Sequence, residues 1–191
     1  PATLRGEVGE QRWEAIADLV RSGVASPLTS SAGRLFDAVA ALCGLRGRVN
    51  YEGQAAGELE SAAEPQPGRG YPARVIADGD APVLIDPREA IRRVHEDVSS
   101  GVPVARVSGR FHEALALAIA EACTRVAARR ATGDVVLAGG VFQNRLLLER
   151  TAELLGEAGL RVLVPRALPP NDGAISFGQL AVAAAGGGSA G

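Results

Sequence analysis

Lysine and methionine are both absent from this sequence of 191 residues, and every basic residue is an arginine. Without lysine the chain has no Walker A motif, so a P-loop nucleotide site is excluded. The arginines are spread along the chain, with doublets at Arg92-Arg93 and Arg129-Arg130, and the formal net charge is −2. Nucleic-acid binding needs basic residues gathered on one face, so we expect no nucleic-acid partner.

Long apolar runs and cysteine pairs are also missing. No stretch approaches the roughly 20 apolar residues that cross a membrane, and no signal peptide is visible, so we expect a cytoplasmic protein without a membrane partner. Cys43 and Cys123 lie inside apolar helical patterns, which favours buried free thiols in a reducing compartment. The chain begins with proline rather than methionine, from which we expect a piece of a longer protein.

The two histidines, His95 and His112, lie on separate helical segments, with neither an H-x-x-x-H pattern nor a cysteine partner. A zinc site needs several such ligands at defined spacing, and triad chemistry needs a serine or cysteine paired with a histidine. Neither arrangement is recognisable, so each histidine is expected to be structural or on the surface. No catalytic residue is assigned from the sequence.

Hydrophobic periodicity predicts a chain dominated by helices. Between the helices, apolar residues on either side of a turn at 78–80 predict a β-hairpin. The helices are predicted over 7–22, from Ser30 or Ser31 to Cys43, over a short stretch after Gly53, over 87–100 and over 103–130, and the hairpin strands over 73–77 and 83–86.

The most informative segment runs from residue 134 to residue 179. A β-branched run over 134–138 is followed by Gly139-Gly140, a helix with leucines at helical spacing, and a second strand over 161–164. The segment ends with Asn171-Asp172-Gly173, which opens a last helix. A strand–helix–strand unit of this kind binds ligands at the carboxyl end of its strands. The sequence therefore predicts a ligand site near the glycine pair.

Several residues have both a structural and a ligand-binding interpretation. Asn144 is either the N-cap of the helix that follows or an amide donor to a base, ribose or phosphate. Asp172 is either an N-cap or anion at the start of a helix, or an oxygen ligand for a cation near nucleotide phosphates. Gly53 marks either a turn or a place where the backbone closely approaches another group. Arg34 and Asp37 form at least an exposed ion pair.

A more specific signal comes from segments taken in order, which read SPLTSSAGRLFDAVAALCGL, NYEGQAAGELE, LAGGVFQNRLLLER and PPNDGAISFGQ. Together they resemble the C-terminal part of the HypF family of hydrogenase-maturation carbamoyltransferases, over about residues 26–183. The resemblance implies an α/β fold, helix-rich with a small mixed sheet, as the second lobe of an actin/Hsp70/sugar-kinase-like (Kae1-like) domain. On this interpretation residues 1–185 form that lobe and residues 186–191 a flexible tail.

The resemblance also implies an activity. Enzymes of the family use carbamoyl phosphate and ATP, pass through carbamoyl-adenylate, and carbamoylate the C-terminal cysteine of the protein HypE. Dehydration there yields the cyanide ligand of nickel–iron hydrogenase. ATP and a divalent metal, iron or magnesium, are therefore the expected cofactors. Carbamoyl phosphate, a HypE-type acceptor and the remaining domains of the same polypeptide are the expected partners.

The family pattern also implies a set of site residues in this sequence. Asp172 matches the metal ligand of the family. The cleft carboxylate is assigned to Glu58, with Glu60 as the alternative. The cofactor-binding residues implied by the resemblance are Ser31, Arg34, Asp37, Gly53, Glu58, Gly139, Gly140 and Asn144.

The sequence also departs from the family pattern. The family takes two further metal ligands from an H-x-x-x-H pattern in the first lobe, which also holds the phosphate-binding turns, and this sequence contains neither. Acylphosphatase-like, zinc-finger and adenylate-forming (YrdC-like) regions are missing as well. A single carboxylate supplies one of the several oxygens that a hard cation needs. We therefore expect no carbamoyl transfer by this chain alone.

Other interpretations remain open. The same lobe occurs in antibiotic O-carbamoyltransferases, whose acceptor is a small alcohol rather than a protein thiol, and in Kae1/TsaD-type proteins that transfer threonylcarbamoyl to tRNA. The charge balance argues against the tRNA type, which needs a basic surface. A further interpretation, from a different functional class, is a non-catalytic module that docks a partner protein.

Overall fold

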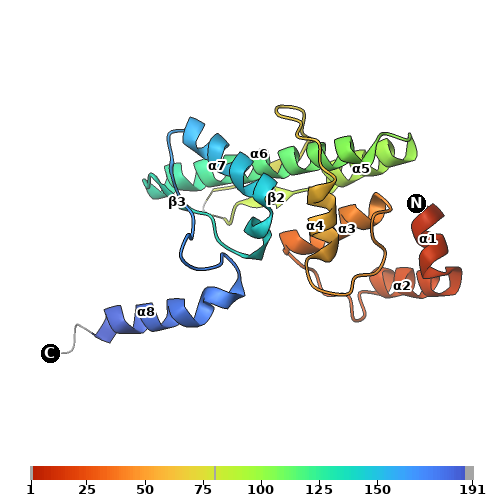
Figure 1. Cartoon of the computed structure of the whole chain (residues 1–191), viewed down its shortest axis with the longest axis horizontal. Coiled ribbons are helices and arrows are strands. Elements are labelled where there is room, and N and C mark those ends of the chain that lie inside the picture. The colour runs from red at the N-terminus through yellow and green to blue at the C-terminus, as the bar shows by residue number, and fades with distance from the viewer. Residues whose placement is uncertain (1, 80, 188–191) are drawn as a thin grey trace.

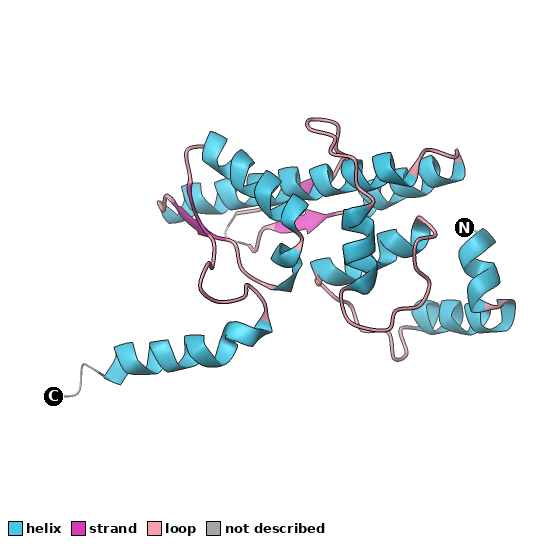
Figure 2. Cartoon of the chain, viewed as in Figure 1, coloured by secondary structure: helices cyan, strands magenta, loops and turns pink. Residues whose placement is uncertain are grey.

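Helices dominate the computed structural model, which describes residues 2–79 and 81–187 (Figures 1 and 2). The turn predicted at 78–80 therefore lies partly outside the described residues. The α-helices are α1 (Ala2–Val8), α2 (Glu10–Ser22), α3 (Ala32–Leu42), α4 (Gln54–Ser61), α5 (Arg88–Ser99), α6 (Val104–Arg130), α7 (Arg145–Glu157) and α8 (Ile175–Gly187). Short 3-10 helices, η1 (Gly140–Gln143) and η2 (Asp172–Ala174), and strands β1 (Arg74–Ile76), β2 (Leu84–Asp86), β3 (Asp134–Val136) and β4 (Arg161–Leu163) complete the described elements.

The long helix α6 is the element around which the core is built. Helices α4, α5 and α7 all contact it, and Figure 1 shows α7 lying along it. Residues 111–116 are all buried, so the middle of α6 is covered on every side. Phe111 meets Phe36 of α3 edge to face, with the ring centres 5.1 Å apart. The core helix predicted over 103–130 is confirmed.

Segment 64–71 lies tightly against α6 although it forms no regular element. The amide of Glu64 donates to the carbonyl of Ala105 at 2.9 Å. A Cβ at Gly109 would lie 1.7 Å from the carbonyl oxygen of Glu64, so the two backbones approach this closely only because Gly109 has no side chain. Gly70 likewise brings its backbone onto α6, since a Cβ there would lie 2.7 Å from a helix amide nitrogen.

The strands pair in two separate places. β1 pairs antiparallel with β2, which confirms the predicted hairpin strands, and β3 pairs parallel with β4. Both strand directions of the expected small mixed sheet are thus present, but they are divided between two two-stranded sheets among the described residues. Parallel neighbours need a long crossover segment between them, and α7 provides it between β3 and β4.

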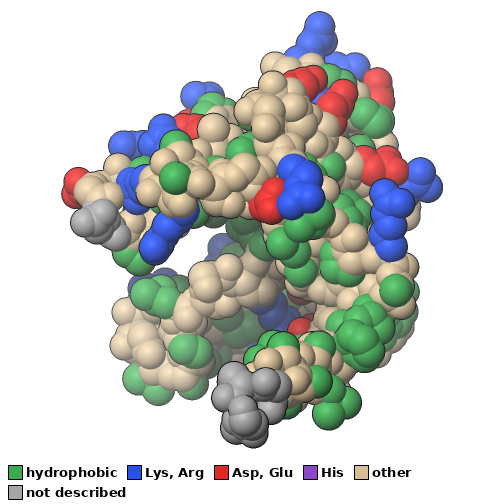
Figure 3. All heavy atoms as spheres, turned by 90° about the vertical axis from the view of Figure 1, so that its left-hand side faces the viewer, with side chains coloured by type: hydrophobic (Ala, Val, Ile, Leu, Met, Phe, Trp, Pro, Cys, Tyr) green, Lys and Arg blue, Asp and Glu red, His purple; other side chains and the backbone are tan. Residues whose placement is uncertain are grey.

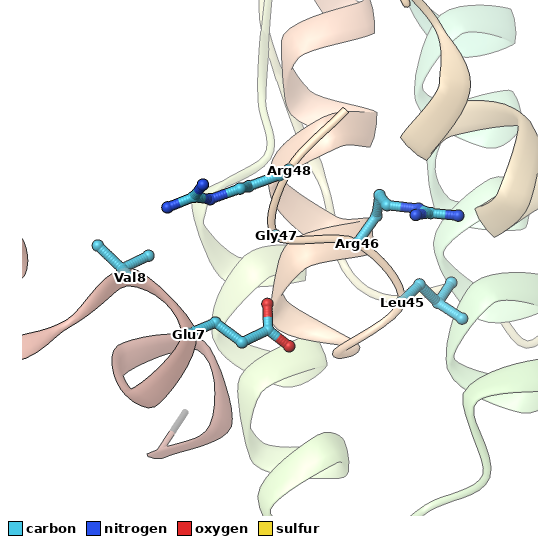
Figure 4. Close-up of a pocket in the computed structure, with 6 residues that line it drawn as sticks. All are labelled: Glu7, Val8, Leu45, Arg46, Gly47 and Arg48. Atoms are coloured by element: carbon cyan, nitrogen blue, oxygen red, sulfur yellow. The ribbon is translucent and has the colours of Figure 1, made fainter. Parts of the chain in front are cut away.

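The helix predicted over 7–22 is wrong in one respect, because the structure divides this region into α1 and α2. Gly9 has a φ of 86°, in the left-handed region that glycine adopts readily, and this residue separates the two helices. Arg5 of α1 then pairs with Glu14 of α2 at 2.5 Å. A cavity of about 360 Å³ lies between α1 and the loop after α3, and it is lined by Glu7, Val8, Leu45, Arg46, Gly47 and Arg48 (Figure 4).

Helix α8 projects away from the other helices, at the end of the molecule opposite α1 and α2 (Figure 1). Its large apolar side chains are exposed, namely Ile175, Phe177, Leu180 and Val182. Figure 3 looks onto this end and shows hydrophobic side chains gathered in its lower half, whereas the charged ones gather above. No helix among residues 2–79 and 81–187 is long and apolar enough to cross a membrane.

The end of α8 also bears on the tail expected from residue 186. The helix continues through Gly187, so its last turn includes the first two residues of that expected tail. The rest of the expected tail, 188–191, lies outside the described residues.

The close contact at Gly109 gives a test of the packing. We expect Gly109→Ala to lower the free energy of unfolding by about 1–3 kcal/mol, the usual cost of overpacking, because the new methyl group would push segment 64–71 away from α6. Gly156→Ala is the matched control: Gly156 is also helical, but no atom outside its own stretch of helix lies within 4 Å of the added methyl group. That variant should gain about 0.5–1 kcal/mol. Urea unfolding measures the free energy of unfolding of both variants. An undiminished stability of Gly109→Ala would contradict the close contact between segment 64–71 and α6.

Candidate functional site

The start of α3 holds several of the sequence-predicted residues. Ser31 is the N-cap, and its hydroxyl accepts from the amide of Arg34 at 3.3 Å, which confirms one of the two predicted capping serines. Arg34 and Asp37 are one turn apart, with 3.8 Å between a guanidinium nitrogen and a carboxylate oxygen. The Arg34 side chain is 74% exposed, so the ion pair contributes little to stability and the guanidinium is accessible to a ligand.

Helix α4 contributes Gly53 and Glu58. Gly53 has a φ of 81° and open space where a Cβ would lie, so the turn favours glycine and leaves its backbone accessible. Glu58 accepts from Nε and Nη2 of Arg46 at 2.9 and 2.5 Å, and from the side-chain amide of Gln54 at 3.3 Å. The hydrogen bond from the Arg46 guanidinium holds the pKa of Glu58 below its usual value.

The cavity under α1 lies apart from the predicted site. None of its lining residues is among the predicted site residues. Arg46 touches both regions through its bond to Glu58, but Figure 4 shows its side chain extending away from Glu7. We therefore do not place the ligand site in this cavity.

The Gly139-Gly140 turn and the Asn171-Asp172 turn lie side by side. The amide of Gly139 donates to the carbonyl of Pro170 at 2.6 Å, and a Cβ on Gly140 would lie 3.9 Å from the Cβ of Asn171. Gly139 has a φ of 106°, and apart from its two chain neighbours no residue has an atom within 4 Å of the position that a Cβ would take. The carboxyl end of β3 therefore presents exposed backbone beside the turn that carries Asp172.

Asp172 is exposed and lies in the first turn of η2, a position that favours an anion. Its interpretation as an N-cap is wrong, because Asn171 fills that role and accepts from the amide of Gly173 at 3.1 Å. Across 2–79 and 81–187, no group of three or more histidine, cysteine, aspartate or glutamate side chains is placed to hold a metal. A single carboxylate does not fit a divalent cation, so these residues do not form a metal site by themselves.

Asn144 is buried, and its side chain is held at both ends. Its carboxamide oxygen accepts from the amide of Leu147 at 2.8 Å, which confirms the capping interpretation. Its Nδ2 donates to Nε2 of His112 at 2.8 Å. An amide group carries two hydrogens on nitrogen, and the residue keeps 9% of its surface exposed. The cap uses the oxygen and the bond to His112 uses one hydrogen, so the second hydrogen of Nδ2 takes part in neither contact.

His112 is buried rather than on the surface, which is one of the two predicted alternatives, and it lies at the centre of a buried polar network. Its Nδ1 is 2.8 Å from the carbonyl oxygen of Ser108, which only accepts, so Nδ1 carries the proton and Nε2 is the acceptor for Asn144. The hydroxyl of Ser108 donates to the carbonyl of Leu59 in α4 at 2.5 Å. Phe36 of α3 meets the imidazole edge to face, with 5.1 Å between the ring centres. The network joins α3, α4, α6 and the start of α7.

Glu60 provides hydrogen-bond acceptors for backbone amides at the start of α7. Its carboxylate accepts from the amides of Arg145 and Leu146 at 2.7 and 3.2 Å, and Asn144 accepts the next amide. Helix N-termini bind phosphate through free amides, so these bonds exclude a phosphate from this helix start. Glu58 is engaged as well, with Arg46 and Gln54, so these contacts do not separate the two residues, and Glu58 stays the candidate that the resemblance implies.

The structure thus gathers the predicted residues in neighbouring groups: the start of α3, helix α4, the glycine turn with Asp172, and Asn144. Helix α3 as a whole contacts both α4 and η1. Sequence reasoning missed the roles of His112 and Ser108 in holding them. The available signal was a pair of polar residues four positions apart on the otherwise apolar side of the helix over 103–130.

The buried imidazole predicts a pH dependence of stability. Burial lowers the pKa of His112 below the ordinary 6.5, because it penalises the charged ring. Below pH 6.5 the unfolded chain binds a proton that the folded chain does not. The contribution of the neutral imidazole to folding stability is therefore complete above about pH 7 and is lost as the pH falls. We expect a slope of up to about 1.4 kcal/mol per pH unit in the free energy of unfolding.

Urea unfolding between about pH 8 and about pH 5.5 measures this slope. His112→Gln should remove it, whereas the matched variant of the exposed histidine, His95→Gln, should leave it unchanged. An unaltered slope in His112→Gln would show that another group titrates in this range.

Comparison with known proteins places the chain among carbamoyltransferases. The family described as "Carbamoyltransferase, Kae1-like Domain, second subdomain" matches residues 2–179. Carbamoyltransferase HypF of Synechocystis sp. is 39% identical over 155 residues, which cover 81% of this chain and 19% of that protein. Carbamoyltransferase HypF of Rhizobium leguminosarum bv. viciae is 41% identical over 161 residues, which cover 83% of this chain and 20% of that protein. The chain spans about a fifth of the length of these curated relatives.

Solved structures agree with these relatives. A crystal structure of full-length HypF in the phosphate- and nucleotide-bound form matches with a TM-score of 0.87 and 34% identity, over 95% of this chain and 24% of that chain. HypF of T. kodakarensis matches with a TM-score of 0.79 and 26% identity, over 92% of this chain and 22% of that chain. The expected fold, a helix-rich α/β lobe of a Kae1-like domain, is thereby confirmed. The chain belongs to the HypF carbamoyltransferase family, as the second subdomain of its Kae1-like domain.

Proposed function

We propose that this chain is one subdomain of an enzyme that uses ATP and carbamoyl phosphate, through carbamoyl-adenylate, to carbamoylate the C-terminal cysteine of a HypE-type acceptor protein. The observation that supports the proposal best is the match of 95% of the chain, at 34% identity, to a full-length HypF whose crystal structure is described as phosphate- and nucleotide-bound. On this proposal the modified thiol serves the maturation of nickel–iron hydrogenase in the cytoplasm.

In this proposal the chain supplies one wall of the nucleotide site. The backbone at Gly139-Gly140 is accessible, so a nucleotide can lie against it with no Cβ between them. Arg34 and Asp37 reach solvent at the start of α3, and Asn144 offers its remaining amide hydrogen. Bound ATP supplies the adenylyl group that activates the carbamate. The residues of this chain bind and orient the nucleotide, and we assign no proton transfer to them.

The remaining domains of the same polypeptide are the proposed partner of this chain. Asp172 alone does not satisfy a divalent metal, iron or magnesium, and in this proposal the remaining domains supply further ligands. Helix α8 leaves Ile175, Phe177 and Leu180 54%, 59% and 70% exposed, and a helix as apolar as this is normally buried. A neighbouring domain packed on α8 would remove that surface from water, which is favourable by about 25 cal/mol per Å².

The acceptor is the least constrained part of the proposal. The relatives from Synechocystis and Rhizobium and the full-length crystal structure bear the name HypF. This favours a protein thiol as the acceptor over the small alcohol of antibiotic O-carbamoyltransferases. A net charge of −2 does not favour a tRNA acceptor. Comparing a cysteine-terminated peptide with a small alcohol as acceptor separates the first two cases.

We expect the 191-residue chain alone to transfer no carbamoyl group, because its described residues provide neither a complete metal site nor a second wall for the nucleotide. The polypeptide that joins it to the remaining HypF domains should carbamoylate a peptide ending in cysteine. Mass spectrometry of the peptide after incubation with ATP and carbamoyl phosphate measures the product. Carbamoylation by the isolated chain would refute the proposal that the site is shared.

Nucleotide binding tests the site residues directly. In the polypeptide with the remaining domains, Asp172→Asn should weaken metal-dependent ATP binding by about tenfold or more, because it removes a charged ligand from an exposed position and leaves the packing intact. Glu157→Gln is the matched control, since it removes an exposed carboxylate at the far end of α7. Asn144→Ala should also weaken binding. Titration calorimetry with ATP measures all three, and full affinity in both site variants would favour a non-catalytic docking module.

A further inference from the structure

His112 lies outside the residue set assigned to the nucleotide, yet it contacts a member of that set. Its Nε2 accepts from Nδ2 of Asn144 at 2.8 Å, and the two residues are 2% and 9% exposed. They are separated by 32 positions in the chain and come from α6 and the start of α7. The contact therefore depends on how these two helices pack.

The surroundings of the imidazole leave it one tautomer and one orientation. Nδ1–H donates to the carbonyl of Ser108 at 2.8 Å, and Phe36 meets the ring from α3. Ser108 is itself fully buried and donates to the carbonyl of Leu59 at 2.5 Å. Rotating the ring would leave buried polar groups without partners, which costs folding free energy. The lone pair of Nε2 is thus held toward Asn144.

This lone pair and the amide of Leu147 together decide which way the amide of Asn144 faces. In the observed orientation the oxygen accepts from the amide of Leu147 and Nδ2 donates to His112. If the amide were turned by half a revolution, two donors would meet at Leu147 and two acceptors would meet at His112. One orientation is therefore selected, and in it the second hydrogen of Nδ2 takes part in neither of these two bonds.

We propose that His112 is a positioning residue for nucleotide binding: it holds the Asn144 amide in the orientation that presents a donor to the nucleotide. This inference rests on the proposed function, in which Asn144 contacts the nucleotide. The hydroxyl of Ser108, one turn before His112, ties the same part of α6 to helix α4, which carries Glu58. His112 itself does not contact the nucleotide.

Two variants separate the roles of the two ring nitrogens. His112→Gln carries an amide group at about the distance of Nε2 from the backbone and retains an acceptor for Asn144. His112→Asn is too short to reach Asn144, but its amide retains a donor for the carbonyl of Ser108. Each variant loses one bond of the buried network, so the two should lose similar stability. A difference in nucleotide affinity between them then reports on Asn144 rather than on folding.

ATP affinity of these variants is measured by calorimetry in the polypeptide with the remaining domains. We expect His112→Asn and Asn144→Ala to weaken binding by about tenfold each, and His112→Gln by less than about threefold. Equal weakening in the Gln and Asn variants would reduce His112 to a structural role and overturn the inference. Full affinity in Asn144→Ala would instead overturn the nucleotide contact of the proposed function, so the two failures are distinguishable.

Nitrogen NMR of the 191-residue chain tests the geometry without any nucleotide. At neutral pH the ring of His112 should be neutral, with the proton on Nδ1 and none on Nε2. A proton on Nε2, in the other tautomer or in the imidazolium, would overturn the inference because Nε2 could not then accept from Asn144.

Discussion

The buried imidazole of His112 constrains the helices that surround it. Polar groups removed from water have to be hydrogen-bonded, or each costs folding free energy. Here the bonds leave α6 in two directions, from Ser108 to the carbonyl of Leu59 in α4 and from His112 to Asn144 at the start of α7. A small shift of either helix would leave a donor or an acceptor unpaired. The network therefore specifies their register more strictly than apolar contacts, which tolerate sliding.

Charged contacts extend the same constraint around the α6–α7 pair. Glu60 of α4 bonds the first amides of α7. Glu113 of α6 is buried, pairs with Arg150 of α7 at 2.9 Å, and accepts from the amide of Gly68 at 2.8 Å. These carboxylates tie α4 and segment 64–71 to the two long helices. The glycine turn after β3 is thereby supported by a rigid base while its own backbone stays accessible, which is the arrangement that a binding site needs.

Much of the fold was predictable because its signals are local. Apolar periodicity located the helix over 103–130, and turn residues located the hairpin and the glycine turn. The break at Gly9 is not predicted, because the apolar spacing within α2 carries no information about the residues that precede it. Of the capping alternatives, Ser31 rather than Ser30 caps α3 and the capping interpretation of Asn144 is confirmed. The capping interpretation of Asp172 is wrong, since adjacent asparagine and aspartate have the same capping preference and the backbone turn selects one of them.

By itself the sequence determined the main helices and the place of the glycine turn, because these follow from spacing along the chain, and its ordered motifs carry the resemblance to the family. The tertiary structure decided that the strands form two separate pairs, that Glu60 occupies the start of α7, and that His112 orients Asn144. Those side-chain contacts join residues 32 to 86 positions apart. Hydrogen bonds over such separations depend on how whole helices pack, and they leave no periodic signal in a single sequence.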